Sequence, residues 1–287
     1  MFYCLHLRDC EVGGAVVSGH LYRFLDGREV DWDARVAEFT AACQGGRLLI
    51  LLHGYNVNRS EGRASLSRYM QFLVAEGWAE PMLAVLWPGD GWAKALTYPF
   101  EGRDADDAGD ALWKWLTTHV KADTRLAFAG HSLGCRVVME AARRLARAGR
   151  LDLDRIVLMA PAIDNDSLGR SGRFGYREAT LRAEQVAVLA SRQDWVLRLA
   201  YPLGDLTQTL LFGERWGRAL GYTGPLEREA AILSRLAPVP AANPARRIDH
   251  GDYLGAAPDG RHTVAESERF VAPFLAGHPR PTWPAAQ

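Results

Sequence analysis

A serine between two glycines is the feature of this sequence that most directly suggests chemistry. Residues 125–134 read RLAFAGHSLG, in which an apolar run leads into a Gly-x-Ser-x-Gly motif, and an amphipathic helical pattern follows at once. A strained turn between a strand and a helix exposes the serine hydroxyl, and the flanking glycines let the backbone pass closely. An incidental serine in a loop would lack this context on both sides. We therefore predict that Ser132 is a nucleophile, with the backbone amide of Leu133 as one oxyanion donor.

A second apolar run, Leu48–Leu52, ends in the residues His-Gly-Tyr-Asn at positions 53–56. In a hydrolase with such a nucleophile, the second oxyanion donor is an amide from a loop of this kind. Gly54 allows a close backbone approach, so the amide of Tyr55 is the candidate donor. His53 precedes the nucleophile in the chain, and we interpret it as a residue that braces the loop, not as the base.

Together with these two segments, the LWPG sequence at Leu86–Gly89 resembles α/β-hydrolases of the esterase and lipase type. The three segments are most similar to a little-characterised bacterial branch whose members read HG[YF]N, WP and GHS[ML]G. Residues 159–164, MAPAID, are also similar to that branch, although a proline–aspartate pair is more usual there. The likeness spans roughly Leu48 to His250. It implies an α/β-hydrolase fold and a serine hydrolase, and it implies little about the substrate.

In this fold the acid and then the histidine follow the nucleophile along the chain. Asp194 comes after the apolar run Gln185–Leu189, where an acid beyond a late strand could orient an imidazole. Its SRQD segment also resembles the Ser-x-x-Asp pattern of the branch. Asp194 precedes a helical stretch as well, so capping that helix is an alternative or additional role. Asp164 and Asp166, after the preceding apolar run, are the alternative acids.

Two histidines follow the acid and are candidates for the base. A short strand at Ala245–Asp249 would place His250 directly at its end, and the HGDY run resembles the Gly-His-x-Tyr element of the family. His262 is the alternative base, in a loop nearer the end of the chain. His278 lies in a proline-rich tail and is discounted.

Short apolar runs alternate with helical periodicity along most of the chain, which predicts a mostly parallel central sheet flanked by helices on both faces. We expect one α/β-hydrolase domain over residues 1–287, with an antiparallel N-terminal edge and a surface tail from about residue 277. The segment 195–245, between the last two strands, is expected to be a helical insert that forms either a lid or an ordinary packed excursion. The expected strands are Tyr3–Leu7, Leu21–Leu25, Leu48–Leu52, Met82–Leu86, Arg125–Ala129, Arg155–Met159 and Gln185–Leu189.

Composition excludes several other classes of protein. The 34 basic and 34 acidic residues leave no net charge, so nothing indicates binding to nucleic acid or to an anionic membrane. No apolar run approaches the ~18 residues of a membrane span, and the first ten residues do not resemble a secretory signal. The four cysteines lack metal-type spacing, and reduced thiols in a cytoplasmic protein are the expectation.

The expected activity is that of a carboxylesterase or lipase-like serine hydrolase, through a Ser132–His250–Asp194 triad and an acyl-enzyme. No metal or organic cofactor is expected, because the sequence has neither HExxH nor GxGxxG. An acyltransferase or a thioesterase could use the same triad. A non-catalytic binding protein with this fold would typically have lost one residue of the triad. The partner is expected to be a small acyl substrate; the acyl chain length and the oligomeric state stay open.

Overall fold

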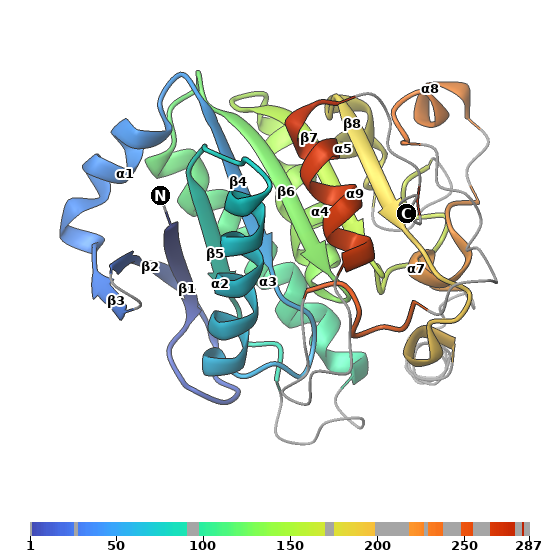
Figure 1. Ribbon diagram of the computed structural model, residues 1–287, viewed down its shortest axis with the longest axis horizontal. Helices are drawn as coiled ribbons and strands as arrows, with labels where there is room; N and C mark the ends of the chain where they lie inside the picture. Colours follow the sequence, from blue (N-terminus) through green and yellow to red (C-terminus); the bar gives the residue numbers. More distant parts are fainter. Residues whose placement is uncertain are drawn as a thin grey trace.

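A twisted sheet with strand order β3-β2-β1-β5-β4-β6-β7-β8 runs through the centre of the molecule (Figure 1). The computed structural model describes residues 2–25, 28–90, 98–169, 175–198, 218–226, 229–237, 248–254, 265–278 and 283. Within these residues the strands are β1 (Phe2–Arg8), β2 (Val16–Leu25), β3 (Arg28–Asp31), β4 (Arg47–Leu52), β5 (Met82–Leu86), β6 (Arg125–His131), β7 (Asp152–Met159) and β8 (Gln185–Leu189).

The sheet is parallel from β1 to β8 and antiparallel at its N-terminal edge. β1 pairs with β5 in parallel, whereas β2 runs antiparallel to both β1 and β3. The predicted antiparallel edge is therefore confirmed, although β1 itself lies inside the sheet. The central strands β4 and β5 are almost completely buried apolar runs, as expected for strands that are covered by helices on both faces.

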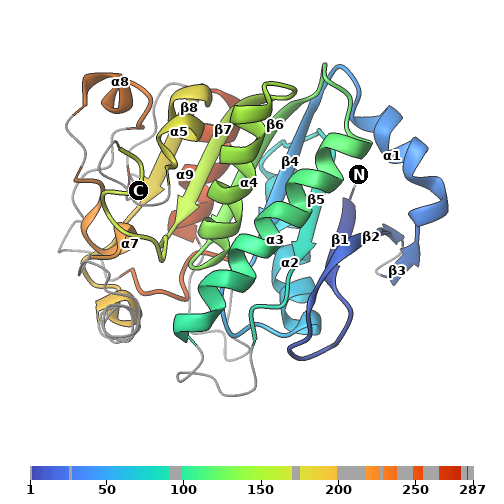
Figure 2. The ribbon, with the colours of Figure 1, turned by 180° about the vertical axis from the view of Figure 1, so that it is seen from behind.

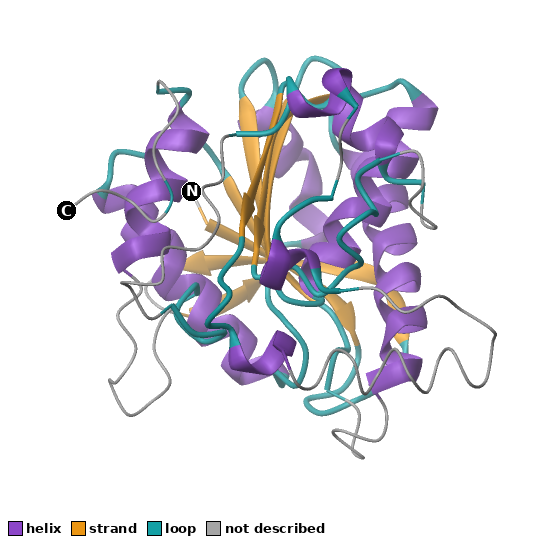
Figure 3. Cartoon of the chain, turned by 90° about the vertical axis from the view of Figure 1, so that its right-hand side faces the viewer, coloured by secondary structure: helices purple, strands orange, loops and turns teal. Residues whose placement is uncertain are grey.

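Helices cover both faces of the sheet. The helical elements are a 3₁₀ turn (Asp33–Arg35), α1 (Val36–Cys43), α2 (Arg59–Ala75), α3 (Tyr98–His119), α4 (Gly134–Ala148), α5 (Arg177–Arg182), α7 (Leu220–Thr223), α8 (Ala230–Leu233) and α9 (Ala265–Ala276). Helices α2 and α9 lie on the face seen in Figure 1, and α3, α4 and α5 lie on the face seen in Figure 2. The edge-on view shows the strands between these two helical layers (Figure 3). Of the helices described, none combines the length and apolar character needed to cross a bilayer.

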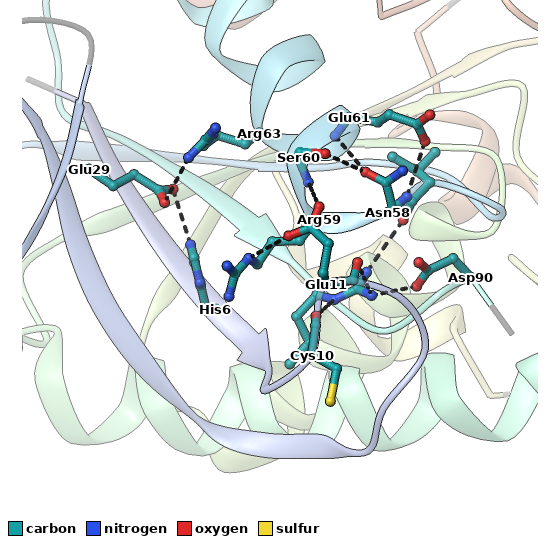
Figure 4. Close-up of polar contacts among 12 residues, drawn as sticks. His6, Cys10, Glu11, Glu29, Asn58, Arg59, Ser60, Glu61, Arg63 and Asp90 are labelled. Carbon is teal, nitrogen blue, oxygen red and sulfur yellow. Dashed lines mark hydrogen bonds and ion pairs between the residues drawn. The ribbon is translucent and has the colours of Figure 1, made fainter. Parts of the chain in front are cut away.

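Local sequence explains where the helices next to the site begin and end. The side chain of Asn58 accepts from the Glu61 amide, and the Glu61 carboxylate accepts from the Asn58 amide, so a capping box starts α2 (Figure 4). Helix α4 presents a wide apolar face to the sheet and ends at Gly149, whose φ of 65° suits a left-handed C-terminal residue.

The C-terminal part of the chain differs from the prediction. Most of the predicted insert 195–245 lies outside the described residues, as do residues 245–247 of the predicted strand. The two described residues of that strand, Ile248 and Asp249, belong to no strand. The outer edge of β8 is paired elsewhere: Val186 forms a parallel bridge with Leu236 through hydrogen bonds to its neighbours. The β8 backbone groups at that point are thus already satisfied.

One residue of the expected surface tail is part of the core. Trp283 is fully buried, and its Nε1 atom donates to the carbonyl oxygen of Ala190 at 3.1 Å. Its ring lies 5.8 Å from that of Tyr253 and 5.9 Å from that of Phe270. A large aromatic side chain with a satisfied N–H gains from burial wherever a pocket accepts it, so the prediction of a purely exposed tail is wrong at Trp283.

Candidate active site

Ser132 occupies a strained turn between β6, which ends at His131, and α4, which begins at Gly134. Its φ is 52°, an unusual value for a residue with a Cβ atom. Two backbone hydrogen bonds join it to residues outside the turn: Ser132 donates to the Met159 carbonyl at 2.9 Å, and Ala162 donates to the Ser132 carbonyl at 3.2 Å. The end of β7 and the loop after it thus fix this turn, the nucleophile elbow, from outside. Backbone strain of this kind is typical of functional sites.

The side chains of Ser132, His250 and Asp194 form one hydrogen-bonded chain. The Nε2 atom of His250 lies 2.8 Å from Ser132 Oγ, and its Nδ1 atom lies 2.8 Å from Asp194 Oδ2. A carboxylate can only accept, so Nδ1 carries the donated proton and Nε2 is free to accept from the serine hydroxyl. This arrangement can remove a proton from a serine and stabilise the imidazolium that results.

Asp194 is completely buried just beyond the end of β8. Its second oxygen, Oδ1, accepts from the backbone amide of Leu197 at 2.8 Å, so the aspartate also caps the turn that follows it. The two roles considered for Asp194 use different oxygens of the same carboxylate and are geometrically compatible.

The alternative acids and the alternative base are placed differently. Both ring nitrogens of His250 are engaged by Ser132 and Asp194, so neither Asp164 nor Asp166 is the hydrogen-bond partner of that ring. Asp164 lies in the loop after β7 and bridges to Ala219. His262 lies outside the described residues.

The loop after β4 lies directly against the serine. A Cβ atom added to Gly54 would come within 3.0 Å of the Ser132 Cβ, and one added to Gly134 would come within 2.2 Å of the His53 carbonyl oxygen. Only glycine at both positions allows this contact between the loop and the elbow. Leu133, the N-terminal cap of α4, directly follows Ser132, and Tyr55 directly follows the glycine that brings the loop against the serine.

His53 ties the β4 loop to the end of β5. Its Nδ1 atom donates to the Gly54 carbonyl at 2.9 Å, and its Nε2 atom accepts from the Trp87 amide at 3.3 Å. The Trp87 indole N–H in turn donates to the His53 carbonyl at 3.0 Å. Burial lowers the pKa of His53 to about 4, so the ring is neutral near pH 7 and can play both hydrogen-bonding roles. This geometry agrees with the interpretation of His53 as a bracing residue.

Sequence reasoning missed a contribution from His131, the residue before the serine. Its Nε2 atom donates to the backbone oxygen of His250 at 2.8 Å, although the two residues are 119 positions apart. Its ring also lies 4.9 Å from the His250 ring and 5.8 Å from the Tyr253 ring. Burial, and then the charge of His250, lowers the pKa of His131 to about 3. His131 is therefore neutral as it supports the turn that carries His250. The motif marked the position of His131 but not its partner.

Arg8 was also missed, and it joins the two loops that flank the site. This buried arginine pairs with Asp90 at 2.7 Å and donates to the carbonyl oxygens of Trp87 at 3.2 Å and Val57 at 3.4 Å. Asp90, which is labelled in Figure 4, directly follows the LWPG segment. A guanidinium with several donors in fixed directions is well suited to holding carbonyls from different loops.

Several solved structures are similar to part of the chain. The type II thioesterase of the yersiniabactin NRPS/PKS biosynthetic pathway is 21% identical over 42% of this chain and 43% of its own, with a TM-score of 0.29. The catalytic core domain of acetyl xylan esterase from Trichoderma reesei is 14% identical over 44% and 68%, with a TM-score of 0.32. An esterase from Pyrococcus furiosus is 17% identical over 56% and 69%, with a TM-score of 0.31. The chain thus spans less than half the length of the thioesterase.

No curated protein shows significant similarity to the chain. A family model described as "Alpha/beta hydrolase of unknown function (DUF900)" matches residues 30–208, more than half of the chain. The matched region runs from β3 past β8 and contains Ser132 and Asp194. Together with the mostly parallel sheet and its two helical layers, this match shows that the chain belongs to the alpha/beta hydrolase family of unknown function, DUF900.

Proposed function

We propose that the protein is a serine hydrolase that cleaves a carboxylic ester, or a similar acyl compound, through an acyl-enzyme on Ser132. The observation that carries this proposal is the hydrogen-bonded chain from Ser132 Oγ through His250 to Asp194, with both contacts at 2.8 Å. Membership in an alpha/beta hydrolase family agrees with it. A non-catalytic relative would have no need to keep a strained serine, a correctly oriented imidazole and a buried acid together.

In the proposed first half-reaction, His250 Nε2 takes the hydroxyl proton as Ser132 Oγ attacks the acyl carbon. Asp194 holds Nδ1 and stabilises the positive charge that develops on the ring. His250 then returns its proton to the departing alcohol or thiol as the tetrahedral intermediate collapses. In the second half-reaction, water takes the place of the serine: it gives a proton to His250 and attacks the acyl carbon. His250 then returns the proton to Ser132 Oγ, which leaves as the carboxylic acid is released.

The oxyanion of the intermediate would be held by the backbone amides of Leu133 and Tyr55. Leu133 lies at the N-terminus of α4, where the helix dipole favours negative charge. The close approach of Gly54 to Ser132 supports a position for the Tyr55 amide on the other side of the reacting carbon. The mechanism uses no metal or organic cofactor, and every proton it moves is carried by Ser132, His250, the leaving group or water.

The same residues would serve a thioesterase or an acyltransferase, because the acceptor is chosen by the shape of the pocket and not by the triad. A carboxylic ester is the substrate class that we propose first. We also propose a cytoplasmic location, since unpaired thiols suit a reducing compartment.

Covalent labelling tests the proposal directly. Treatment with a fluorophosphonate should add one mass increment, located on Ser132, and Ser132→Ala should prevent it. The same variant should lower kcat on nitrophenyl esters by ~10⁴-fold or more, as loss of the nucleophile does in serine hydrolases. A series of ester chain lengths, run beside acyl thioesters, ranks the substrate classes. Labelling of another serine, or no labelling of folded protein, would overturn the proposal.

A further inference from the structure

Three side chains with metal-binding chemistry gather on the N-terminal edge of the sheet. Cys4 and His6 lie two residues apart on β1 and so point to the same face. Glu29 comes from β3, and its Oε1 atom lies 3.1 Å from His6 Nε2 (Figure 4). One ligand atom from each of the three residues lies within 4.8 Å of the other two.

The cluster is enclosed by the protein. Cys4 is completely buried, His6 is nearly so, and the side chain of Glu29 is 12% exposed. The sheet order places two strands, β5 and β4, between β1 and β6. Three inter-strand spacings, about 14 Å, thus separate the cluster from the strand that carries Ser132. The cluster therefore does not belong to the proposed active site.

We propose that Cys4, His6 and Glu29 form a binding site for a zinc-type divalent metal ion. A thiolate, an imidazole and a carboxylate are the three ligand types that Zn²⁺ prefers, at about 2.0–2.3 Å. A tetrahedral ion with such bonds separates its ligand atoms by about 3.5 Å. Ligand atoms within 4.8 Å of one another can therefore close on an ion by small side-chain rotations. Three protein ligands leave the fourth position for a water molecule.

Charge balance supports this ligand set. A divalent cation with one thiolate, one carboxylate and one neutral imidazole carries no net charge, which suits a buried position. A cysteine binds a metal ion as its thiolate. Metal binding would then release the thiol proton. The charged or titratable groups facing Cys4 are His6, Glu29 and Tyr22 on the sheet and Arg59 and Arg63 on α2.

Arg63 would compete with the ion for the carboxylate of Glu29. Its Nη1 atom lies 3.4 Å from Glu29 Oε2, and its side chain is 47% exposed (Figure 4). The long, exposed side chain can turn to solvent when a metal takes the carboxylate. The ion would join β1 to β3 across β2 and stabilise the antiparallel edge, so its effect should appear in stability and not in the chemistry at Ser132.

Cobalt and zinc titrations of the full chain, first stripped with a chelator, test the site. Co²⁺ should bind with a stoichiometry of one and produce visible bands of tetrahedral type together with a near-ultraviolet thiolate-to-cobalt band. Zn²⁺ should abolish both features and raise the melting temperature. Calorimetry in buffers of different ionisation enthalpy should detect the released proton.

Matched variants separate the site from adventitious binding. Cys4→Ser should remove the thiolate band, whereas Cys10→Ser, at the exposed cysteine on the following turn, should keep it. Glu29→Gln should weaken binding by at least about 10-fold, the loss that even an outer-shell partner causes. Arg63→Gln should tighten it. The absence of a thiolate band in folded wild-type protein would overturn the proposal, as would a band that survives in Cys4→Ser. If Cys4→Ser fails to fold, unchanged affinity in Glu29→Gln would overturn it.

Discussion

The Nε2 atom of His131 lies 2.8 Å from the backbone oxygen of His250. The residue before the serine thus holds the turn that carries His250, and the His250 side chain faces that serine. The nucleophile and the proposed base are therefore connected twice, once through the His250 ring and once through its backbone. Because His131 is the last residue of β6, the turn that carries His250 is anchored to the central sheet although it belongs to no strand itself.

Loss of this anchor should lower turnover while leaving the fold intact. We expect His131→Leu to reduce kcat by about 10- to 100-fold, because a displacement of about 1 Å of a catalytic group costs that much. KM should change far less. His131→Gln should recover much of the activity, since its amide N–H can donate to the same carbonyl. Steady-state kinetics with melting temperatures as a folding control measure this, and equal losses in Leu and Gln variants would contradict the anchoring role.

Exchange of the acid should separate its two functions. Asp194→Asn keeps an oxygen for the Leu197 amide, so the cap and the fold should persist. The amide would no longer accept properly from His250 Nδ1, and kcat should fall by as much as about 10⁴-fold. Asp164→Asn and Asp166→Asn should be mild by comparison. Kinetics on one nitrophenyl ester rank the three variants, and a larger loss in Asp164→Asn would move the acid to the loop after β7.

The two histidines near the C-terminus should differ sharply. We expect His250→Ala to abolish measurable turnover, because its ring contacts both Ser132 and Asp194 at 2.8 Å. His262→Ala should retain most of the wild-type kcat. Circular dichroism of both variants serves as the folding control. An inactive His262→Ala beside an active His250→Ala would refute the assignment of the base.

The buried ring of His53 should make the protein less stable in acid. Its pKa of about 4 lies below the ordinary value near 6.5, so between pH 6.5 and pH 4 the unfolded chain binds a proton that the folded chain does not. The free energy of unfolding should therefore fall as the pH falls through this window, by up to about 1.4 kcal/mol per pH unit. His53→Gln lacks this group, so its stability should depend on pH less steeply by that amount. Urea unfolding at pH 7, 6 and 5 measures the pH dependence of the free energy of unfolding for the wild type and for His53→Gln. Equal slopes in the two proteins would contradict the prediction, because they would show that His53 takes up its proton in the folded state as it does in the unfolded chain.

Much of the parallel sheet could be predicted from the sequence, because its signals are local. The strands β5 and β8 have the bounds that their apolar runs predict, since a strand buried on both faces must be apolar throughout. The elbow could also be predicted, because a strand, a glycine-flanked serine and a helix adjoin one another in the chain. Order along the chain limited the acid and the base to a few candidates, and the resemblance of the SRQD and HGDY segments to the family favoured Asp194 and His250 among them.

The remaining features depend on residues that the fold brings together from distant positions. The bond from His131 to His250 and the contacts of Arg8 with the loops after β4 and β5 leave no periodic trace in the sequence, because they join residues that lie far apart in the chain. The same holds for the pairing of β8 with Leu236, where a strand was expected at Ala245–Asp249, and for the burial of Trp283 in the tail. Local patterns report which residues need burial or a particular turn, whereas only the packed chain decides which distant group meets that need.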